Sequence, residues 1–262
     1  MNGTTLYTTQ LQAGLGLVGD TKELLDLWHP GMTASQLHQK ALDSGRFPNV
    51  TARRLRNIVS ECFAPRYLVS LGAPAQHLKS LSGGIAGSDL IQLMLIFTAR
   101  ANPILGDFIR TVYWARYAGG YTEIANEDAR QFVERAIGDG KTSVRWSETT
   151  VRRVSAYLTG CCADYGLLGS GSRSRRRLQT FRISTVAAAY LAYDLHFAGL
   201  GDNALLAHVD WELFGLSRED VLGELKKLSL KGLLIVQAAG DAVRISWKQA
   251  NMEDLCDVLA QG

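Results

Sequence analysis

The chain has 262 residues, of which 47% are hydrophobic and 20% are charged, and its net charge is +3. This composition is typical of a globular protein and excludes a disordered one. The longest apolar runs, such as residues 186–193, are far shorter than the roughly 20 residues of a membrane span. The N-terminus also lacks the basic and apolar regions of an export signal, so we expect a cytoplasmic protein with no membrane contact.

Residue types that carry chemistry are scattered along the chain. The four cysteines show no CxxC spacing, and three of them lie on apolar helical faces, which favours reduced core thiols. The five histidines form no HExxH or His-x-His pair, and no GxSxG or paired-carboxylate motif stands out. We therefore expect no enzyme, no metal and no cofactor, with a catalytic site assembled from distant residues as the alternative.

Residues 14–19 match the dinucleotide-binding pattern GxGxxG. That pattern needs a buried strand before it and an acidic residue after a second strand, about 20 residues later. The preceding residues are rich in Thr and Gln, and an amphipathic helix follows at 35–41. The sequence therefore favours a glycine-rich helix or turn packed closely on a neighbour over a nucleotide site.

Three short helices follow: residues 20–28, a helix capped by Thr33 and a helix capped by Thr51. The third has a buried stripe and a polar face, and Arg46 and Arg66 add to the charge of this stretch, where Glu61 is the only acid. Two helices with a tight turn predict a helix-turn-helix that enters a major groove, and a solvated polar face is the alternative. The candidate DNA contacts are Arg53, Arg54, Arg56 and Asn57.

Residues 88–117 are apolar nearly all round, with a break at Asn102. A helix that is apolar on every side is buried, so this pair of helices is expected to form the central scaffold. A further helix, capped by Asn126 and stopped by Gly138, precedes the basic part of the chain.

Positive charge is concentrated in residues 141–182, where nine Lys and Arg face two acids, for a local charge of +7. We expect a capped helix at 147–165, a Gly/Ser/Arg segment at 169–177 and a strand at 178–183. A helix followed by a two-stranded ribbon with a basic tip is typical of a winged helix that binds nucleic acid.

The helix at 147–165 has a buried stripe at intervals of three and four residues. Its opposite face joins small and basic residues, which suits a helix pressed into a groove. The residues expected on this free face are Thr149, Arg152, Arg153, Ala156 and Gly160. In the following strand, Phe181 and Ile183 are expected on the buried face and Arg182 on the outer face.

The arginines of the Gly/Ser-rich tip are expected to track phosphates or enter a narrow minor groove, because the tip is flexible. The candidate residues of the ribbon are Arg173, Arg175, Arg176, Arg177 and Arg182, and Arg145 precedes the helix. These five ribbon arginines carry a salt slope of up to about −4.5 if each neutralises one phosphate. A disordered basic loop without a dedicated partner is the alternative.

Residues 185–262 repeat the order of helices and hairpin, but six Lys and Arg face eleven acids, for a local charge of −5. Helices are expected at 186–198, at 204–209 and after Ser217. The hairpin residues expected on one face are Leu233, Ile235, Val243, Ile245 and Trp247. An acidic winged helix binds phosphate poorly, so we expect protein contacts or homo-oligomer formation here.

These patterns predict a mainly α protein, an array of helix-turn-helix and winged-helix units with small β-hairpin wings around a buried helical scaffold. The expected domains are an N-terminal helix-turn-helix unit (1–82), the central helical scaffold (83–140), a basic winged-helix element (141–184) and an acidic C-terminal winged helix (185–262).

Four segments together point to a known family. They are Tyr7 with Leu15-Gly16-Leu17; Thr51 with Arg53-Arg54, Phe63 and Arg66-Tyr67; Pro103-Ile104-Leu105 with Asp107-Phe108, Val112-Tyr113-Trp114 and Tyr117; and Trp146-Ser147 with Thr150, Arg152-Arg153-Val154 and Tyr165-Gly166-Leu167-Leu168. Over nearly its whole length the chain resembles the BrxA family of the bacteriophage-exclusion (BREX) defence systems. The resemblance implies a bacterial, non-enzymatic, mostly helical protein that binds double-stranded DNA and acts with other BREX components.

The sequence as a whole therefore predicts a non-enzymatic double-stranded DNA-binding protein of a BREX phage-defence system. The alternative is an assembly or adaptor protein whose basic wing and acidic C-terminal unit bind protein partners. RNA is a weaker candidate, because the basic segment lacks the interleaved aromatic residues on which bases stack.

Overall fold

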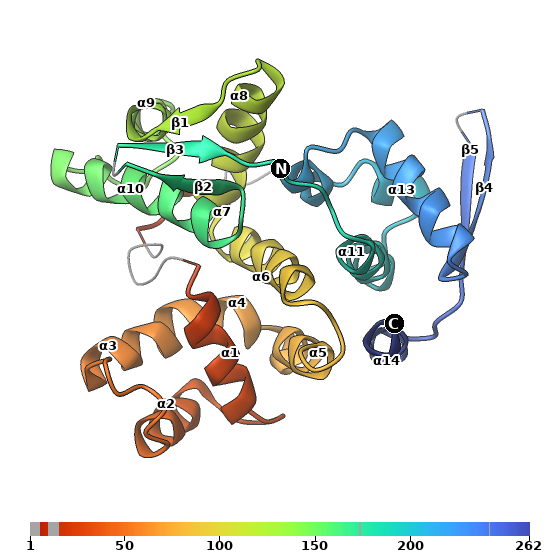
Figure 1. The fold of residues 1–262 in the computed structure, drawn as a ribbon, viewed down its shortest axis with the longest axis horizontal. Coiled ribbons are helices and arrows are strands. Elements are labelled where there is room, and N and C mark those ends of the chain that lie inside the picture. The colour runs from red at the N-terminus through yellow and green to blue at the C-terminus, as the bar shows by residue number, and fades with distance from the viewer. Residues whose placement is uncertain (1–5, 10–15, 173, 241) are drawn as a thin grey trace. The chain divides into compact units, whose positions relative to one another are not determined.

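The computed structural model describes residues 6–9, 16–172, 174–240 and 242–262. The chain packs into two compact units, each visible in Figure 1: unit 1 is Met1–Gln76 with Phe97–Phe181, and unit 2 is His77–Ile96 with Arg182–Gly262. Both are mainly helical and contain small antiparallel sheets, which confirms the predicted helical class. The two units group the chain more coarsely than the four predicted domains, whose finer division stays a prediction.

Unit 1 begins with α1 (Val18–Leu27), α2 (Ala34–Asp43) and a continuous helical run of α3 (Ala52–Asn57), η2 (Ile58–Phe63) and α4 (Ala64–Tyr67). The predicted caps are confirmed, because the hydroxyls of Thr33 and Thr51 accept hydrogen bonds from backbone N–H groups three residues later. Such caps satisfy donors that have no partner inside the helix. The predicted stripe of the third helix is buried at Leu55, Ile58, Val59, Cys62 and Phe63.

The helical middle of the chain follows a short turn η3 (Ser70–Gly72) and consists of α5 (Ala73–Leu81), α6 (Gly87–Ala101), α7 (Pro103–Phe108), η4 (Ile109–Tyr113) and α8 (Trp114–Ala118). The boundary between the two units falls inside α6. The predicted burial is confirmed for α6 but fails at the end of α8, where Tyr117 is 40% exposed. No helix in the described ranges, α6 included, is long and apolar enough to cross a membrane.

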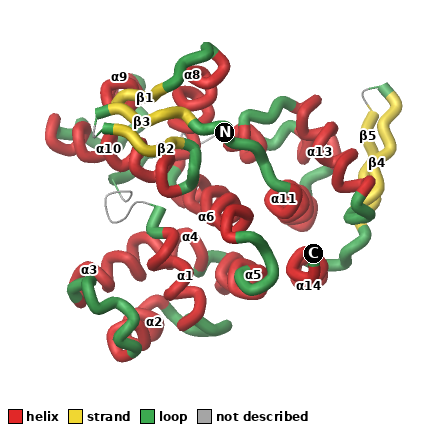
Figure 2. The backbone as a smooth tube through the Cα atoms, in the orientation of Figure 1, coloured by secondary structure: helices red, strands yellow, loops and turns green. Residues whose placement is uncertain are grey.

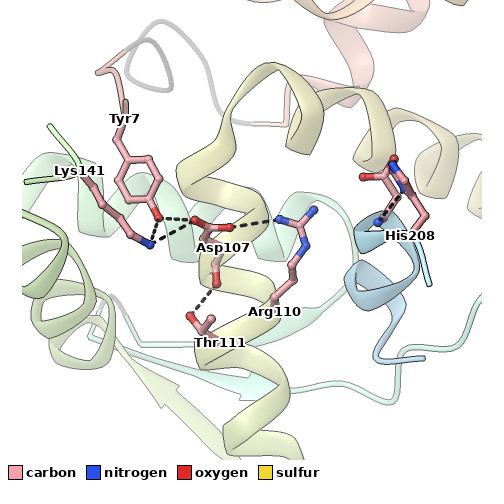
Figure 3. A network of polar contacts seen from close by, with 7 residues as sticks. Tyr7, Asp107, Arg110, Thr111, Lys141 and His208 are labelled. Atoms are coloured by element: carbon pink, nitrogen blue, oxygen red, sulfur yellow. Dashed lines mark hydrogen bonds and ion pairs between the residues drawn. The ribbon is translucent and has the colours of Figure 1, made fainter. Parts of the chain in front are cut away.

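The N-terminal segment is fixed to the middle of unit 1 through Tyr7, which is buried. Its hydroxyl donates a hydrogen bond to Asp107, whose carboxylate also pairs with Arg110 Nη1 at 3.2 Å and Lys141 Nζ at 3.6 Å (Figure 3). Burial and the neighbouring carboxylate raise the pKa of Tyr7, so the phenol remains a neutral donor. One carboxylate thus joins three segments that are distant in the sequence, which gives Asp107 a structural role.

The second half of unit 1 contains β1 (Glu123–Ala125), α9 (Asn126–Gly138), α10 (Glu148–Asp164), β2 (Leu168–Gly171) and β3 (Arg175–Leu178). The strands form an antiparallel sheet in the order β1-β3-β2, drawn in yellow at the upper left of Figure 2. Helix α10 packs against α9 and contacts β2. Ser147 caps α10 as predicted, whereas the residue that caps α9 is Ala125 and not Asn126.

The strand predicted at residues 178–183 is wrong, because β3 ends at Leu178. Strand β3 pairs with both neighbours, and its pairing with β1 runs from Glu123↔Arg177 to Ala125↔Arg175. The short β1 therefore sets where the sheet begins and ends. Phe181 is buried as predicted, but it lies in the chain that follows the sheet.

Unit 2 contains α11 (Thr185–Phe197), α12 (Asp202–Leu206), η5 (Val209–Phe214), α13 (Arg218–Leu230), β4 (Leu234–Ala239), β5 (Ala242–Trp247) and α14 (Met252–Gln261). Helix α11 has no exposed residue before Phe197, and α13 and α14 pack against it. Tyr193 of α11 holds the hairpin, because its hydroxyl donates to the Leu233 carbonyl at 2.5 Å and accepts from the Lys248 N–H at 3.1 Å.

The hairpin of unit 2 forms where it is predicted, but β4 faces the opposite way. Leu234 is buried and Ile235 is 46% exposed, whereas Val243 and Ile245 of β5 are buried as expected. The register pairs Val236 with Ile245, so Leu234 and Val236 lie on the inner face. A shift of one residue turns every side chain of a strand to the other face. The prediction that Leu233 and Ile235 share the inner face with Val243 and Ile245 is therefore wrong by one residue.

All four cysteines are buried and free. Burial raises the pKa of Cys161 and of Cys256 to about 12, because a low-dielectric environment disfavours the thiolate. They are therefore protonated at neutral pH, which confirms the predicted core thiols.

Candidate nucleic-acid interface

The arginines of β3 form the centre of the candidate interface. Side chains alternate along the strand, so that Arg175 and Arg177 are exposed while Arg176 is half-buried. Since β3 lies between β1 and β2, its backbone is hydrogen-bonded on both sides. The arginines predicted on a flexible tip therefore belong to a fixed strand, with the exception of Arg173, which lies outside the described residues.

The Gly/Ser-rich segment is part of this sheet rather than a loose tip. A Cβ added at Gly171 would lie 2.2 Å from the Arg175 carbonyl oxygen, and one at Gly169 would lie 2.3 Å from Gln179 Nε2. The register between β2 and β3 shifts between Leu168 and Gly171, which is the pattern of a β-bulge. Glycine is needed at these positions because the strands approach closely. The Gly/Ser-rich composition therefore reflects close packing and not the flexible tip predicted from the sequence.

The arginines of β3 have one acidic residue opposite them in the sheet, Glu123 of β1 across from Arg177. Arg175, Arg176 and Arg177 form no ion pair with any residue in the described ranges. Arg176 lies close enough to Asp164 to lower the pKa of that carboxyl, but burial dominates and the pKa of Asp164 is raised overall. Unit 1 as a whole contains twenty Lys and Arg against thirteen acids, whereas unit 2 contains eight against twelve.

Helix α10 adds a second row of basic residues next to this sheet. Thr149, Arg152 and Arg153 are exposed as predicted, and so is Ala156. Gly160 is buried instead, on a helix that packs against both α9 and β2. The free face of α10 is therefore limited to its first three turns, where both arginines lie.

Arg145 occupies a different setting. It lines an open cavity of about 1010 Å³ between α9 and the start of α10, together with Trp146, Glu134 and Glu148. Two acidic residues on the same wall reduce its value for binding phosphate.

The N-terminal arginines are only partly available. Arg53 and Arg56 are exposed, Arg54 and Asn57 are half-buried, and Arg54 lowers the pKa of Asp20 against the larger effect of burial. Two arginines that contribute to the predicted charge of this stretch are not available, which corrects that prediction. Arg46 pairs with Glu23 at 3.2 Å and Asp26 at 3.4 Å, and Arg66 is 2% exposed.

Gly16 connects the N-terminal helices to the end of α10. Its N–H donates to Asp164 Oδ2 at 2.8 Å, and its carbonyl accepts from the Tyr165 hydroxyl at 3.2 Å and from Arg66 Nη1 at 3.4 Å. A Cβ added at Gly16 would lie 2.6 Å from the Cβ of Asp164. This close packing confirms the interpretation of the glycine-rich segment as a packed turn at Gly16, while Gly14 lies outside the described residues.

Arg182 lies beyond the end of β3. It belongs to unit 2, its side chain is exposed, and its carbonyl accepts a hydrogen bond from Gln92 Nε2 at 2.8 Å. The structure thus brings together Arg175, Arg176 and Arg177 on one strand, while Arg152 and Arg153 lie on α10, which packs against the neighbouring strand β2.

Exposed aromatic residues near the sheet were not predicted. Tyr117 is 40% exposed and Tyr121 is 56% exposed, both between η4 and β1. The sequence offers one signal that could have found Tyr121, because it directly follows Gly119 and Gly120, which end a helix, and it precedes a short strand.

Comparisons with known proteins agree with this description. The fold is that of a mainly helical protein with small antiparallel sheets. It is similar to the crystal structure of an uncharacterized protein from Magnetospirillum magneticum, with a TM-score of 0.56 and 19% sequence identity over 73% of this chain and 94% of that chain. No curated protein matches. The sequence model of the BrxA family matches residues 5–194.

The chain therefore belongs to the BrxA family, as its sequence resemblance predicts. This membership associates it with the BREX systems of phage defence. The matched residues include all of α10 and the three-stranded sheet and end within α11. The elements from α12 to α14, including the hairpin of β4 and β5, lie beyond the match.

Proposed function

We propose that this protein binds double-stranded DNA without catalysing a reaction, as a component of a BREX defence system. The observation that carries the proposal is the run of arginines on β3, which is fixed in the middle of a sheet and forms no ion pair with a described residue. Phosphate contacts supply most of the affinity of such a surface, and they fix the orientation of the protein on the duplex.

The order of elements supports a winged-helix assignment for the second half of unit 1. The helical run α7–η4–α8 is followed by β1, α9, α10, β2 and β3, with strands in the order β1-β3-β2. In a winged helix the last helix enters the major groove while the hairpin contacts the neighbouring backbone. In this proposal α10 inserts its exposed Arg152 and Arg153, and the arginines of β3 contact phosphates.

A protein-contact role is the second candidate, for unit 2. Its excess of acids, twelve against eight Lys and Arg, disfavours phosphate binding. We assign unit 2 to contacts with another BREX component or with a second copy of the chain. Recovery of a protein partner that survives nuclease treatment is the expected result, and loss of that partner after nuclease treatment would contradict it.

The DNA proposal is tested by titrating a labelled duplex with the protein over a series of salt concentrations. Four exposed arginines, Arg152, Arg153, Arg175 and Arg177, give a slope of log K against log salt of up to about −3.6 if each neutralises one phosphate. We expect duplex DNA to bind more tightly than duplex RNA of the same sequence, because side chains cannot enter the narrow major groove of the RNA helix. A slope near zero, or absence of duplex binding, would contradict the proposal.

Replacing Asp164 is expected to raise the affinity for duplex DNA, whereas replacing an arginine lowers it. Its carboxylate lies beside Arg176 and reduces the positive potential of the sheet. Asp164→Asn is expected to tighten duplex binding about twofold at low salt, because one negative charge that interacts with Arg176 is removed. Fluorescence anisotropy at two salt concentrations measures the effect, which decreases as salt increases.

The same variant has an expected pH signature in stability. Burial raises the pKa of Asp164 in the folded protein above its value in the unfolded chain. The folded protein is therefore most stable when this carboxyl is protonated, and it loses stability as the pH rises through the interval between the two pKa values. The Asn variant lacks this loss, while its amide oxygen can still accept from Gly16. It is expected to gain stability relative to the wild type at pH 7 and to lose that gain near pH 3. A difference that is constant with pH would contradict this account of Asp164.

A further inference from the structure

A shallow cavity of about 340 Å³ lies between α8 and α9, outside the arginine surface described above. Its walls include Arg116, Tyr121, Asp128, Gln131 and Arg135. The volume is at the lower end of the roughly 300–1,000 Å³ that is usual for small-molecule sites. An aromatic ring, an amide, a carboxylate and two guanidinium groups thus face the same space.

The side chains of this cavity are held in place by one another. Asp128 forms an ion pair with Arg116 and accepts a hydrogen bond from the Ala125 N–H at 2.9 Å. The guanidinium of Arg116 lies 4.3 Å from the centroid of the Tyr121 ring, a cation–π contact. Tyr121 nevertheless remains 56% exposed, so the part of its ring that Arg116 does not cover is available to a ligand.

The cavity wall is connected to the sheet that carries the basic residues through the short segment from Tyr121 to β1. Strand β1 starts two residues after Tyr121, and the residue between them, Thr122, accepts a hydrogen bond from the Leu178 N–H at 2.9 Å. The register then places Glu123 opposite Arg177. Tyr121 of the cavity wall therefore lies two residues from the strand that pairs with the arginines of β3.

We propose that this cavity binds one unpaired nucleobase of a DNA strand whose backbone lies along β3. The base stacks on Tyr121, its polar edge meets the Gln131 amide, and Arg135 faces the adjoining phosphate. Aromatic stacking together with amide hydrogen bonding is the usual chemistry by which proteins hold an unpaired base. The inference rests on the proposed DNA binding and extends it, because it names the form of DNA that the surface prefers.

The requirement for an unpaired base follows from the geometry of duplex DNA. Inside a duplex both faces of a base are covered by neighbouring bases, so only a bulged, extruded or single-stranded base can stack on a protein ring. A protein with this cavity therefore favours DNA with a local defect or an opened strand over a perfect duplex of the same length.

The test compares a labelled perfect duplex with the same duplex carrying a single bulged 2-aminopurine. Wild-type protein is expected to bind the bulged duplex about fivefold more tightly, the lower limit of what stacking of one base contributes. Stacking on Tyr121 should also quench the fluorescence of the 2-aminopurine. Tyr121→Leu is expected to abolish both the preference and the quenching without change in affinity for the perfect duplex, whereas Tyr121→Phe retains them.

Tyr117→Leu is the matched control, because Tyr117 lies on α8 and is exposed but does not line the cavity. Thermal melting checks that all variants are folded. Equal affinity of the wild type for both duplexes, or a preference that survives in Tyr121→Leu, overturns this inference and leaves the proposed duplex binding standing. Binding to neither DNA overturns both proposals, and tighter binding of bulged RNA than of bulged DNA overturns the assignment to DNA.

Discussion

Replacing Arg175, Arg176 and Arg177 together by Ala is expected to flatten the dependence of duplex affinity on salt by about 2 to 2.7 units of slope. Each phosphate that is no longer neutralised removes about 0.9 from the slope of log K against log salt. Between 50 and 200 mM salt the wild type should then lose about 15- to 40-fold more affinity than the variant. Anisotropy titrations of one duplex at four or more salt concentrations measure this difference.

The range of this expected effect reflects the different settings of the three side chains. Arg175 and Arg177 are exposed, so both can contact phosphate without rearrangement. Arg176 is half-buried and near Asp164, so it contributes less unless the carboxylate is neutralised. The three guanidinium groups are attached to one strand that is paired on both sides, which limits the entropy lost when they bind.

Two controls separate charge from fold. The triple Arg→Lys variant keeps the charge and should retain the slope. Arg130→Ala removes a cation of α9 that pairs with Glu134 at 2.8 Å and lies near Glu127; it is not a proposed phosphate contact, so the slope should not change. A triple Ala variant with the slope of the wild type would show that β3 does not contact DNA.

Tyr165→Phe is expected to lower the free energy of unfolding of unit 1 by about 1–3 kcal/mol, because buried Thr98 Oγ1 loses this partner and the Gly16 carbonyl keeps only the longer hydrogen bond from Arg66. The Tyr165 hydroxyl contacts the Thr98 Oγ1 at 2.6 Å and donates to the Gly16 carbonyl at 3.2 Å. The side chain is 1% exposed, so water cannot replace the missing oxygen without rearrangement.

Urea denaturation followed by circular dichroism and tryptophan fluorescence measures this loss. Tyr157→Phe is the matched control, because Tyr157 lies on the same helix, is only half-buried and makes no hydrogen bond through its hydroxyl with a described residue. Its effect should stay within about 0.5 kcal/mol. Equal losses in the two variants would contradict the role given to the Gly16 contact.

Local features of the fold could be predicted from the sequence. The caps at Thr33, Thr51, Ser147 and Ser217 are confirmed, because a cap depends on a few neighbouring residues. The buried stripe of α3 and η2 is confirmed for the same reason. The apolar stripe of a helix can be recognised from the helix's own residues, whichever part of the chain packs against it.

The strand that carries the candidate site could not be placed from the sequence. Strand β3 consists mainly of arginine, and its position follows from pairing with β1, whose residues lie about 50 positions earlier. An antiparallel strand with one solvated face normally alternates apolar and polar residues, and Arg175-Arg176-Arg177 shows no such alternation. In the same way β4 begins in the uniformly apolar run Leu233–Val236, where alternation cannot define which residues face inward.

Counting charges also overstates the N-terminal basic surface. Arg66 is enclosed by the segments around Gly16, and Arg46 is neutralised by carboxylates of α1. The residues that enclose Arg66 and neutralise Arg46 are distant from them in the sequence. The sum of formal charges over a stretch therefore differs from the charge that the stretch exposes to solvent. The +7 of residues 141–182 is more reliable, because five of its arginines are exposed or half-buried on α10 and β3 without an ion pair to a described residue.

The position of β3 between two other strands also affects how this protein resists degradation. A succession of arginines in a loose loop is an ideal substrate for trypsin-like proteases. Paired on both sides, the same residues can be cleaved only after the sheet opens, so that the rate follows the free energy of local opening. The chain can therefore present a dense row of arginines to a polyanion while remaining a poor substrate for the proteases that recognise that residue.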